Sequence, residues 1–301
     1  MDTEKCTALL AALEAGSLST AGEQLGYSPS GMSRMISSME RETGFLLLKR
    51  DPSGVSATEQ CEKLLPVIRR LAADGETYRQ LSAELLGKKI GTLVVGTAYP
   101  FFYPWLADAL SSYRLLYPDI QIRIQEGSSS ELCKKLADRQ MDICIVSQRP
   151  GDMAWIPLFR DPLVAWVSKN GPYASEKEFS LEKLSIEPYI HVDQGKDTDN
   201  LRMFSLTGIT PNICYTASDS YAAYTMVEAG LGVSVNNAIT SSQWNGDVAI
   251  LPLKPYQDVE IGIAAMTDGR RSPVAEDFLE YLKEKIKNAG KSYASKTLQH
   301  F

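Results

Sequence analysis

The side chains best suited to chemistry near the start of the chain are short hydroxyls and arginines on one face of a predicted helix. From residue 29 onward, Met32, Ile36 and Met39 recur at helical spacing and form an apolar stripe. The opposite face is polar and partly cationic, and consists of Ser30, Ser33, Arg34, Ser37 and Arg41. A helix with one packing face and one short polar face fits the DNA major groove, where such groups bind base edges and phosphates. The pattern therefore predicts a DNA-reading helix.

A second predicted helix precedes this one across a tight turn. Its apolar residues lie three and four apart, and they are Leu18, Ala21 and Leu25. Gly26 permits the backbone conformation of a sharp turn. Ser28 can cap the following helix, and Pro29 stands at its first position, where the missing N–H costs nothing. Residues 17–40 therefore predict a helix-turn-helix, with another helix before it at 3–15.

Basic residues follow the helix pair in a predicted small hairpin. Gly44 ends the second helix, and two short strands are expected on either side of 52–54. This hairpin, or wing, would carry Lys49 and Arg50 beside the phosphates of a duplex. The net charge of −6 by itself disfavours a nucleic-acid partner. These two residues and the arginines of the helix nevertheless form a candidate local positive patch.

A long helix is predicted after the hairpin. Ser56-Ala-Thr-Glu59 matches a capping box, and the helix could run to about Leu86. Positions in alternating steps of four and three form a heptad seam: Leu64, Ile68, Leu71, Gly75, Tyr78, Ser82 and Leu85. Such a seam packs either on its own domain or on a second copy of the chain. Pro66 would kink this helix or delay its start.

Strand-like and helical segments alternate beyond a break at 87–91, which indicates parallel β/α units. The first set is expected at 92–97, 100–117, 120–125, 129–139 and 143–146. The second set has strands at 163–167, 189–192, 213–216 and 232–235, and a helix at 219–229. A strand at 259–266 returns to the first set, and an amphipathic helix at 274–287 follows. The expected fold class is α/β, with two Rossmann-like subdomains after an all-α-type N-terminal domain.

Hydroxyl-rich loops lie at the predicted carboxyl ends of these strands. In open α/β folds ligands bind there, beside helix N-termini whose free N–H groups suit carboxylates and other small anions. The side chains expected at this cleft are Thr97, Tyr99, Ser128, Ser129, Ser147, His191 and Asp219. Each could singly serve only as a helix cap or in packing. Their convergence favours a binding site for a small, anionic molecule.

Residue types needed for catalysis or metal binding are scarce. The only histidines are His191 and His300, and no Ser-His-Asp or Cys-His arrangement can be assembled. The five cysteines are scattered without a C-x-x-C pair or a metal-ligand spacing. Gly230-Leu-Gly232 closes a helix instead of following a strand, so it is not a dinucleotide loop. We expect no enzymatic activity, no cofactor and no metal.

Length and composition predict a cytoplasmic protein. At 301 residues, the chain is long enough for about two domains. An apolar fraction of 44% with 23% charged residues is ordinary for a globular protein. No apolar run is long enough to span a membrane, and the N-terminus lacks a secretory pattern. The scattered cysteines are expected to be reduced.

The stretch from Leu9 to Thr58 resembles the winged helix-turn-helix of LysR-type transcriptional regulators. The positions that carry the resemblance are Gly16, Ser17, Ala21, Leu25, Ser28, Ser33, Arg34, Ile36, Glu40, Gly44, Arg50, Thr58 and Glu59. Pro29-Ser30 stands where the family usually has Gln-Pro, and 57–61 departs from the usual Leu-Thr-x-x-Gly. The missing glutamine removes a frequent base contact.

The rest of the chain resembles the effector domain of the same family, which is similar to type 2 periplasmic binding proteins. The matching stretches are 91–96, 126–132, 141–143 and 227–232, while Asn236-Asn237 stands where the family commonly has proline. Together the resemblance covers about residues 4–288. It implies a winged helix-turn-helix at 1–58, a dimerising linker helix at 59–88, an effector domain at 89–290 and a polar tail at 291–301. Subdomain I would comprise about 91–162 and 267–290, and subdomain II about 163–266.

The resemblance implies a regulator that binds double-stranded promoter DNA as a homodimer or homotetramer and responds to a small-molecule effector. Its DNA-binding residues would be Ser28, Ser30, Ser33, Arg34, Ser37, Lys49 and Arg50. No membrane partner is expected. The alternative is a solute-binding or enzymatic α/β protein whose helical N-terminus is an oligomerisation arm. A secreted binding protein would need a signal peptide and an enzyme a catalytic constellation, and the sequence shows neither.

Overall fold

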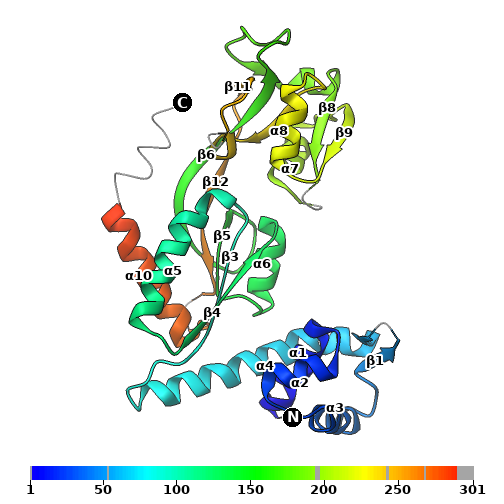
Figure 1. Ribbon diagram of the computed structural model, residues 1–301, viewed down its shortest axis with the longest axis vertical. Coiled ribbons are helices and arrows are strands. Elements are labelled where there is room, and N and C mark those ends of the chain that lie inside the picture. The colour runs from blue at the N-terminus through cyan, green and yellow to red at the C-terminus, as the bar shows by residue number, and fades with distance from the viewer. Residues whose placement is uncertain (1, 53, 194–196, 242–243, 268, 290–301) are drawn as a thin grey trace.

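The computed structural model describes residues 2–52, 54–193, 197–241, 244–267 and 269–289. Figure 1 shows a helical N-terminal domain, the long helix α4 and an elongated α/β domain in succession along the chain. The expected polar tail at 291–301 and its His300 lie outside the described residues.

The N-terminal domain begins with the helices predicted from the sequence. They are α1 (Thr3–Ala15), α2 (Leu18–Leu25) and α3 (Pro29–Thr43). Ser17 caps α2 and Ser28 caps α3, while Gly26 adopts a left-handed conformation with φ 74° at the turn. Fully buried side chains from all three helices form one core, which includes Leu9, Ala21, Met32, Ile36 and Met39. The helix-turn-helix prediction is confirmed.

The predicted wing is also present and is tied to the helices at both strands. It consists of β1 (Leu48–Asp51) and β2 (Gly54–Ala57), which pair antiparallel. Oε1 of Glu40 on α3 accepts the N–H groups of Leu47 and Leu48 at 2.9 and 3.3 Å. The N–H of Val55 donates to the Gly16 carbonyl at 2.9 Å. These bonds hold the wing in a set position beside α3.

Helix α4 (Glu59–Glu84) connects the N-terminal domain to the rest of the chain. Its N-cap is Thr58, whose hydroxyl accepts the N–H of Cys61 at 3.1 Å, so the cap expected at Ser56 is wrong. The helix continues through Pro66 and does not start late. The first half of the expected heptad seam packs inside the chain's own N-terminal core, and comprises Leu64, Ile68 and Leu71.

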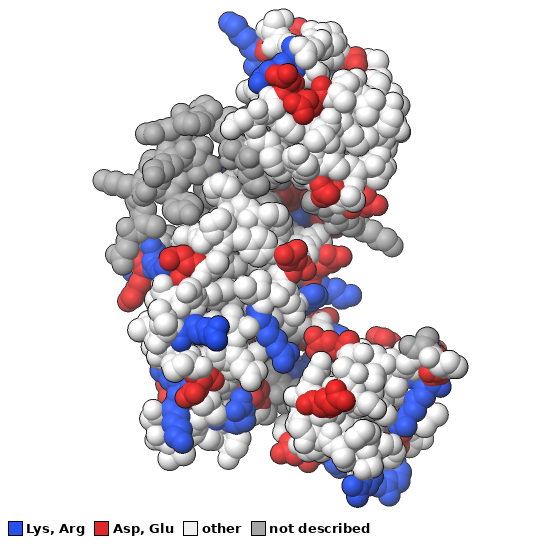
Figure 2. All heavy atoms as spheres, viewed as in Figure 1, with Lys and Arg blue, Asp and Glu red and all other residues white. Residues whose placement is uncertain are grey.

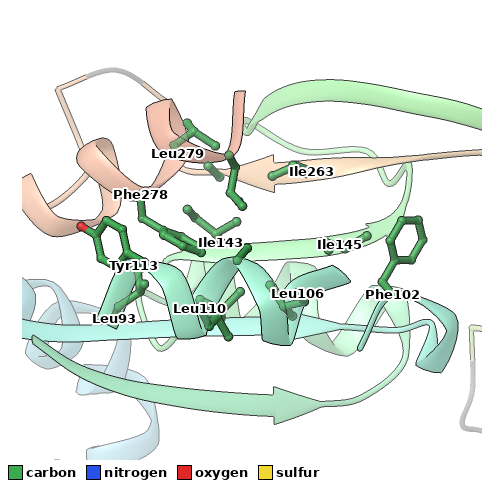
Figure 3. Packing of buried hydrophobic residues seen from close by; sticks show 14 of the residues in the cluster. Leu93, Phe102, Leu106, Leu110, Tyr113, Ile143, Ile145, Ile263, Phe278 and Leu279 are labelled. Atoms are coloured by element: carbon green, nitrogen blue, oxygen red, sulfur yellow. The ribbon is translucent and has the colours of Figure 1, made fainter. Parts of the chain in front are cut away.

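The first unit of the α/β domain is a parallel sheet with helices on both faces. Its elements are β3 (Gly91–Thr97), η1 (Pro100–Phe102), α5 (Tyr103–Leu116), β4 (Ile120–Glu126), α6 (Ser129–Ala137) and β5 (Ile143–Ser147). Strand β3 pairs in parallel with both β4 and β5. Helices α5 and α10 (Pro273–Ala289) cover one face and α6 the other. Figure 3 shows Leu110 of α5, Phe278 of α10 and Ile143 of β5 in one core.

One long strand, β6 (Ala154–Ser168), joins the two units of the domain. Its first half pairs with β12 (Asp258–Ala265), which also pairs with β5. Its second half pairs with β10 (Ser234–Asn237) and β11 (Val248–Lys254). With β7 (Phe179–Ser180) at the far edge, the order is β4-β3-β5-β12-β6-β11-β7, and β10 also pairs with β6. The two units therefore share one mixed sheet of eight strands.

The second unit is completed by a smaller parallel pair of strands and several helices. These elements are η2 (Leu181–Ser185), β8 (Tyr189–Val192), α7 (Asp199–Thr207), β9 (Ile213–Ala217), α8 (Ser220–Glu228) and α9 (Ala238–Ser241). Strands β8 and β9 pair in parallel. The α/β fold class is confirmed, with the two subdomains built on a shared sheet.

Two details of this domain differ from the expectation. Strand β6 begins at Ala154, well before the expected 163–167, and β11 was not expected. Pro157, Pro162 and Pro252 interrupt the apolar patterns that predict these strands. The strand expected to return to the first set at 259–266 is present as β12, which pairs with β5.

A buried carboxyl group lies where β6 passes from one unit to the other. Asp161 is 3% exposed, and its Oδ1 accepts the N–H of Ile239 at 3.1 Å. Burial raises the pKa of Asp161 to about 7. Because the folded pKa lies above that of an unfolded chain, the native state binds an extra proton in between, and stability falls as the pH rises towards 7.

Replacing Asp161 with asparagine should remove this pH dependence. Asn keeps an oxygen for the Ile239 N–H but does not ionise. We expect Asp161→Asn to gain about 1–3 kcal/mol in stability relative to wild type between about pH 5 and about pH 8. Urea unfolding at both pH values measures this, with Asp119→Asn at an exposed position as the control. An unchanged difference between Asp161→Asn and wild type at the two pH values would contradict the prediction.

Candidate functional site

The outer face of α3 carries the polar residues that the sequence places there. Met32, Ile36 and Met39 are completely buried. The residues three and four apart on the other side are exposed, and they are Ser30, Arg34, Ser37 and Arg41. Ser33 is half-buried between the two faces. The helix therefore presents an uninterrupted stripe of hydroxyls and guanidiniums to the solvent.

Hydrogen bonds at the start of α3 distinguish the side chain that caps the helix from the side chains that can bind a ligand. The Ser28 hydroxyl accepts the N–H of Gly31 at 3.1 Å and lies 3.1 Å from the Ser30 hydroxyl. The Ser28 hydroxyl therefore serves as the N-cap of α3. Nε of Arg34 donates to the Ser30 carbonyl at 3.3 Å, which lays the side chain along the helix and leaves its other guanidinium N–H groups for a ligand.

The wing extends the basic surface beyond α3. Lys49 and Arg50 are exposed on β1. Figure 2 shows Lys and Arg side chains along the lower and outer edges of the N-terminal domain, where Figure 1 places α3 and β1. The acidic Glu40 is turned inward to the wing backbone, and Glu42 pairs with Lys5 at 2.9 Å. The positive groups are thus gathered on one surface of an acidic chain.

A second candidate site is a cleft of about 250 Å³ between the two α/β units. The first unit contributes the loop after β3, the start of α6 and the residue Arg149 after β5. The second unit contributes the starts of α7 and α8 and the end of β10. The polar and aromatic lining includes Tyr99, Ser128, Ser129, Arg149, Thr198, Asp199, Asn200, Asp219, Tyr221, Asn236, Asn237, Thr240 and Trp244.

The structure brings four of the expected cleft residues to the lining and sets three behind or outside it. The lining holds Tyr99, Ser128, Ser129 and Asp219. The Thr97 hydroxyl bonds the backbone of Tyr99 instead, and Ser147 is 1% exposed behind Ser129, with their hydroxyls 3.0 Å apart. His191 does not line the cleft, and its Nδ1 is buried without a hydrogen-bond partner among the described residues.

Two charged residues that the sequence patterns did not mark, Arg149 and Asp199, also line the cleft. Nη2 of Arg149 donates to Oδ1 of Asp199 at 3.0 Å, and the two side chains are only 5% and 10% exposed. Nη1 of Arg149 also donates to the Ser147 hydroxyl at 2.6 Å. Arg149 lies two residues beyond β5, so the rule that placed Ser147 at a strand end could have found it. Asp199 follows Thr198, the cap of α7, and no pattern marked it.

The same carboxylate is bonded by a buried tyrosine. The phenol of Tyr99 donates to Oδ2 of Asp199 at 2.7 Å. Burial raises the pKa of Tyr99 well above its usual value, and the negative charge of Asp199 raises it further. The phenol is therefore a proton donor at any physiological pH. A neighbouring pair also joins the two units across the cleft. The hydroxyl of Ser130 donates to Oδ2 of Asp197 at 2.5 Å, and this hydrogen bond is the main cause of the lowered pKa of Asp197.

Neither a metal site nor a membrane helix is found in the described part of the chain. No group of three or more His, Cys, Asp or Glu residues there could hold a metal ion. None of the described helices is long and apolar enough to span a bilayer. None of the five cysteines forms a disulfide bond. Four of them are buried, and Cys214 on β9 is exposed.

Both parts of the chain match known families. Residues 4–62 match the bacterial regulatory helix-turn-helix protein, lysR family, and residues 87–287 match the LysR substrate binding domain. The HTH-type transcriptional regulator YvbU of Bacillus subtilis, itself uncharacterized, is 28% identical over 90% of this chain and 94% of its own length.

Solved structures share the fold of the whole chain. Full-length OxyR from Pseudomonas aeruginosa has a TM-score of 0.73 at 21% identity, over 94% of this chain and 95% of that chain. Full-length CbnR in complex with its target DNA has a TM-score of 0.58 at 20% identity, over 94% and 99% of the two chains. The matched families are regulators and not enzymes, so the alternative of an α/β enzyme or solute-binding protein is wrong. The chain belongs to the LysR family of bacterial helix-turn-helix transcriptional regulators.

Proposed function

We propose that this protein regulates transcription by binding promoter DNA as a homo-oligomer under the control of a small anionic effector. The observation that carries the proposal is the exposed stripe of Ser30, Arg34, Ser37 and Arg41 on α3, next to a basic wing. A protein with this role acts in the cytoplasm. The division of the chain would be DNA binding by 1–58, dimerisation by 59–88 and effector binding by 89–290.

The geometry supports a major-groove position for α3. An arginine on the outer face of such a helix can bind guanine O6 and N7 together, and serines on either side reach bases or phosphates. Arg34 lies at the centre of the stripe, with Ser30 and Ser37 one turn away on each side. Ser33 at the edge of the face would add a contact, while Ser28 would hold the helix start. Lys49 and Arg50 on the wing would bind backbone phosphates.

The first test is DNA binding by the Arg34→Ala variant. We expect its affinity for the intergenic DNA beside its own gene to fall about 10-fold to 100-fold, because one bidentate base contact is lost. Gel-shift titrations at several salt concentrations measure this. Arg114→Ala, at an exposed position on α5 in the effector domain, is the matched control and should bind as wild type does. Equal affinity of wild type and Arg34→Ala would overturn the assignment of α3.

The linker helix supports a dimer through its later turns. Leu64, Ile68 and Leu71 pack inside the chain, but large apolar side chains remain exposed further along α4. They are Tyr78, Leu81 and Leu85, which are 75%, 48% and 88% exposed. Their spacing of three and four residues is that of a coiled-coil seam. Two copies paired on this face would present two α3 helices to two half-sites about one helical turn apart.

Charges placed in this seam should separate the copies. We expect Leu81→Asp combined with Leu85→Asp to lower the molar mass in solution, because each copy would bring two unpaired carboxylates into the interface. Light scattering after size exclusion measures the mass at several concentrations. Leu206→Asp, which replaces another exposed leucine on α7 of the second unit, should leave the mass unchanged. An unchanged oligomer with both seam substitutions would exclude this face as the dimer contact.

The cleft between the units supports binding of the effector. Its lining combines a buried guanidinium, several hydroxyls and the start of α6, whose positive helix dipole end and free N–H groups favour anions. Binding there would bias the position of one unit relative to the other. The first unit is tied to α4, because Arg69 pairs with Asp138 at 3.1 Å and the N–H of Val274 donates to Gln80 at 3.2 Å. A change between the units can therefore reach the DNA-binding domain.

A further inference from the structure

Asp199 makes contacts across the cleft that its own helix does not require. It stands at the first position of α7, where Thr198 already provides the cap by accepting the N–H of Leu201 at 3.3 Å. Its carboxylate points away to the other unit. There it receives the Tyr99 phenol, the Ser147 hydroxyl at 2.5 Å and the Arg149 guanidinium. Both carboxylate oxygens are therefore bonded by the first unit alone.

These three donors form a complete receptor for a carboxylate. A guanidinium, a hydroxyl and a phenol converge on one pair of oxygens at 3.0, 2.5 and 2.7 Å. All three side chains are at most 5% exposed, so their interactions with an anion are strong. Ser129 helps to position Ser147, because its hydroxyl accepts the N–H of Ser147 at 3.0 Å. A carboxylate of a separate molecule could therefore accept the same three hydrogen bonds.

We propose that Tyr99, Ser147 and Arg149 form the effector's carboxylate subsite, and that Asp199 occupies it as an internal competitor until the effector displaces it. The inference rests on the proposed function only in taking the cleft as the effector site. Displacement of Asp199 breaks three of the bonds that hold the start of α7 to the first unit, while those from Ser130 and Arg149 to Asp197 remain. The signal is then a looser attachment of the second unit to the first, rather than the filling of an empty cleft.

Because Asp199 is part of the same chain as the three donors, only some anions can displace it from them. A group held on the same chain acts at an effective concentration of about millimolar or above, so a simple monocarboxylate gains little against it. The effector must add contacts elsewhere in the cleft, where Asn200, Asn236 and Thr240 provide hydrogen-bonding groups. The expected class is a small organic acid with a carboxylate at one end and several polar groups beyond it.

Acetate tests the subsite, because it is the carboxylate of an aspartate side chain without the chain. In Asp199→Ala the three donors lose their partner and a space of the same size opens. We expect acetate to raise the melting temperature of this variant by about 3 °C or more, relative to chloride at equal ionic strength, and to leave wild type unchanged. Asp219→Ala, which removes a carboxylate from the same cleft but from the cap of α8, should not respond to acetate.

Two further arms keep the test decisive. If Asp199→Ala does not fold, Asp199→Ser leaves room for acetate with a polar residue at the same position, and the same rise is expected. Adding Arg149→Ala to either variant should abolish the acetate effect. Equal stabilisation of wild type and variant, or no stabilisation of either variant, would overturn the inference. Because these measurements contain no DNA, failure of wild type to bind promoter DNA would overturn the proposed function alone.

Discussion

The two α/β units are constrained by one strand that belongs to both. Strand β6 is paired along its first half with β12 and along its second half with β10 and β11. Neither unit can move away without breaking a ladder, so relative motion must come from twisting of β6 near Asp161 and Pro162, where its partners change. The remaining contacts across the cleft are made by side chains. The width of the cleft is therefore set by a small number of hydrogen bonds, which Asp197 and Asp199 accept from the first unit.

The contacts of α4 indicate which part of the molecule can move relative to the rest. Helix α4 is built into the N-terminal core at one end and is bonded to the first α/β unit through Arg69 and Gln80. The described contacts thus make the DNA-binding domain, α4 and the first unit a connected body. The second unit is held to that body by β6 and by the charged contacts of the cleft. In an oligomer, a shift of the second unit would change the contacts that this unit makes with another copy.

Much of this arrangement could be predicted from local sequence patterns. Helix periodicity, caps and glycine turns located α1, α2 and α3 at their observed bounds, because these signals act within a few residues. Strand ends correctly brought Tyr99, Ser128, Ser129 and Asp219 to one cleft. The Arg149–Asp199 pair was missed, because the residues are fifty positions apart and meet only through the folded sheet. Strand β11 was missed because Pro252 interrupts its pattern, and its pairing with β6 is a tertiary effect.

The inward-facing carboxylate of Glu40 has a consequence for how DNA specificity can change. It holds the wing through backbone N–H groups of Leu47 and Leu48, which are present whatever the side chains are. The position of the wing beside α3 is thus independent of the exposed side chains of α3. In the proposed function, substitutions at Ser30, Arg34 or Ser37 would change the preferred DNA sequence and leave the position of the wing unchanged. Glu40 would then let sequence preference change without a change in the contacts that the wing makes.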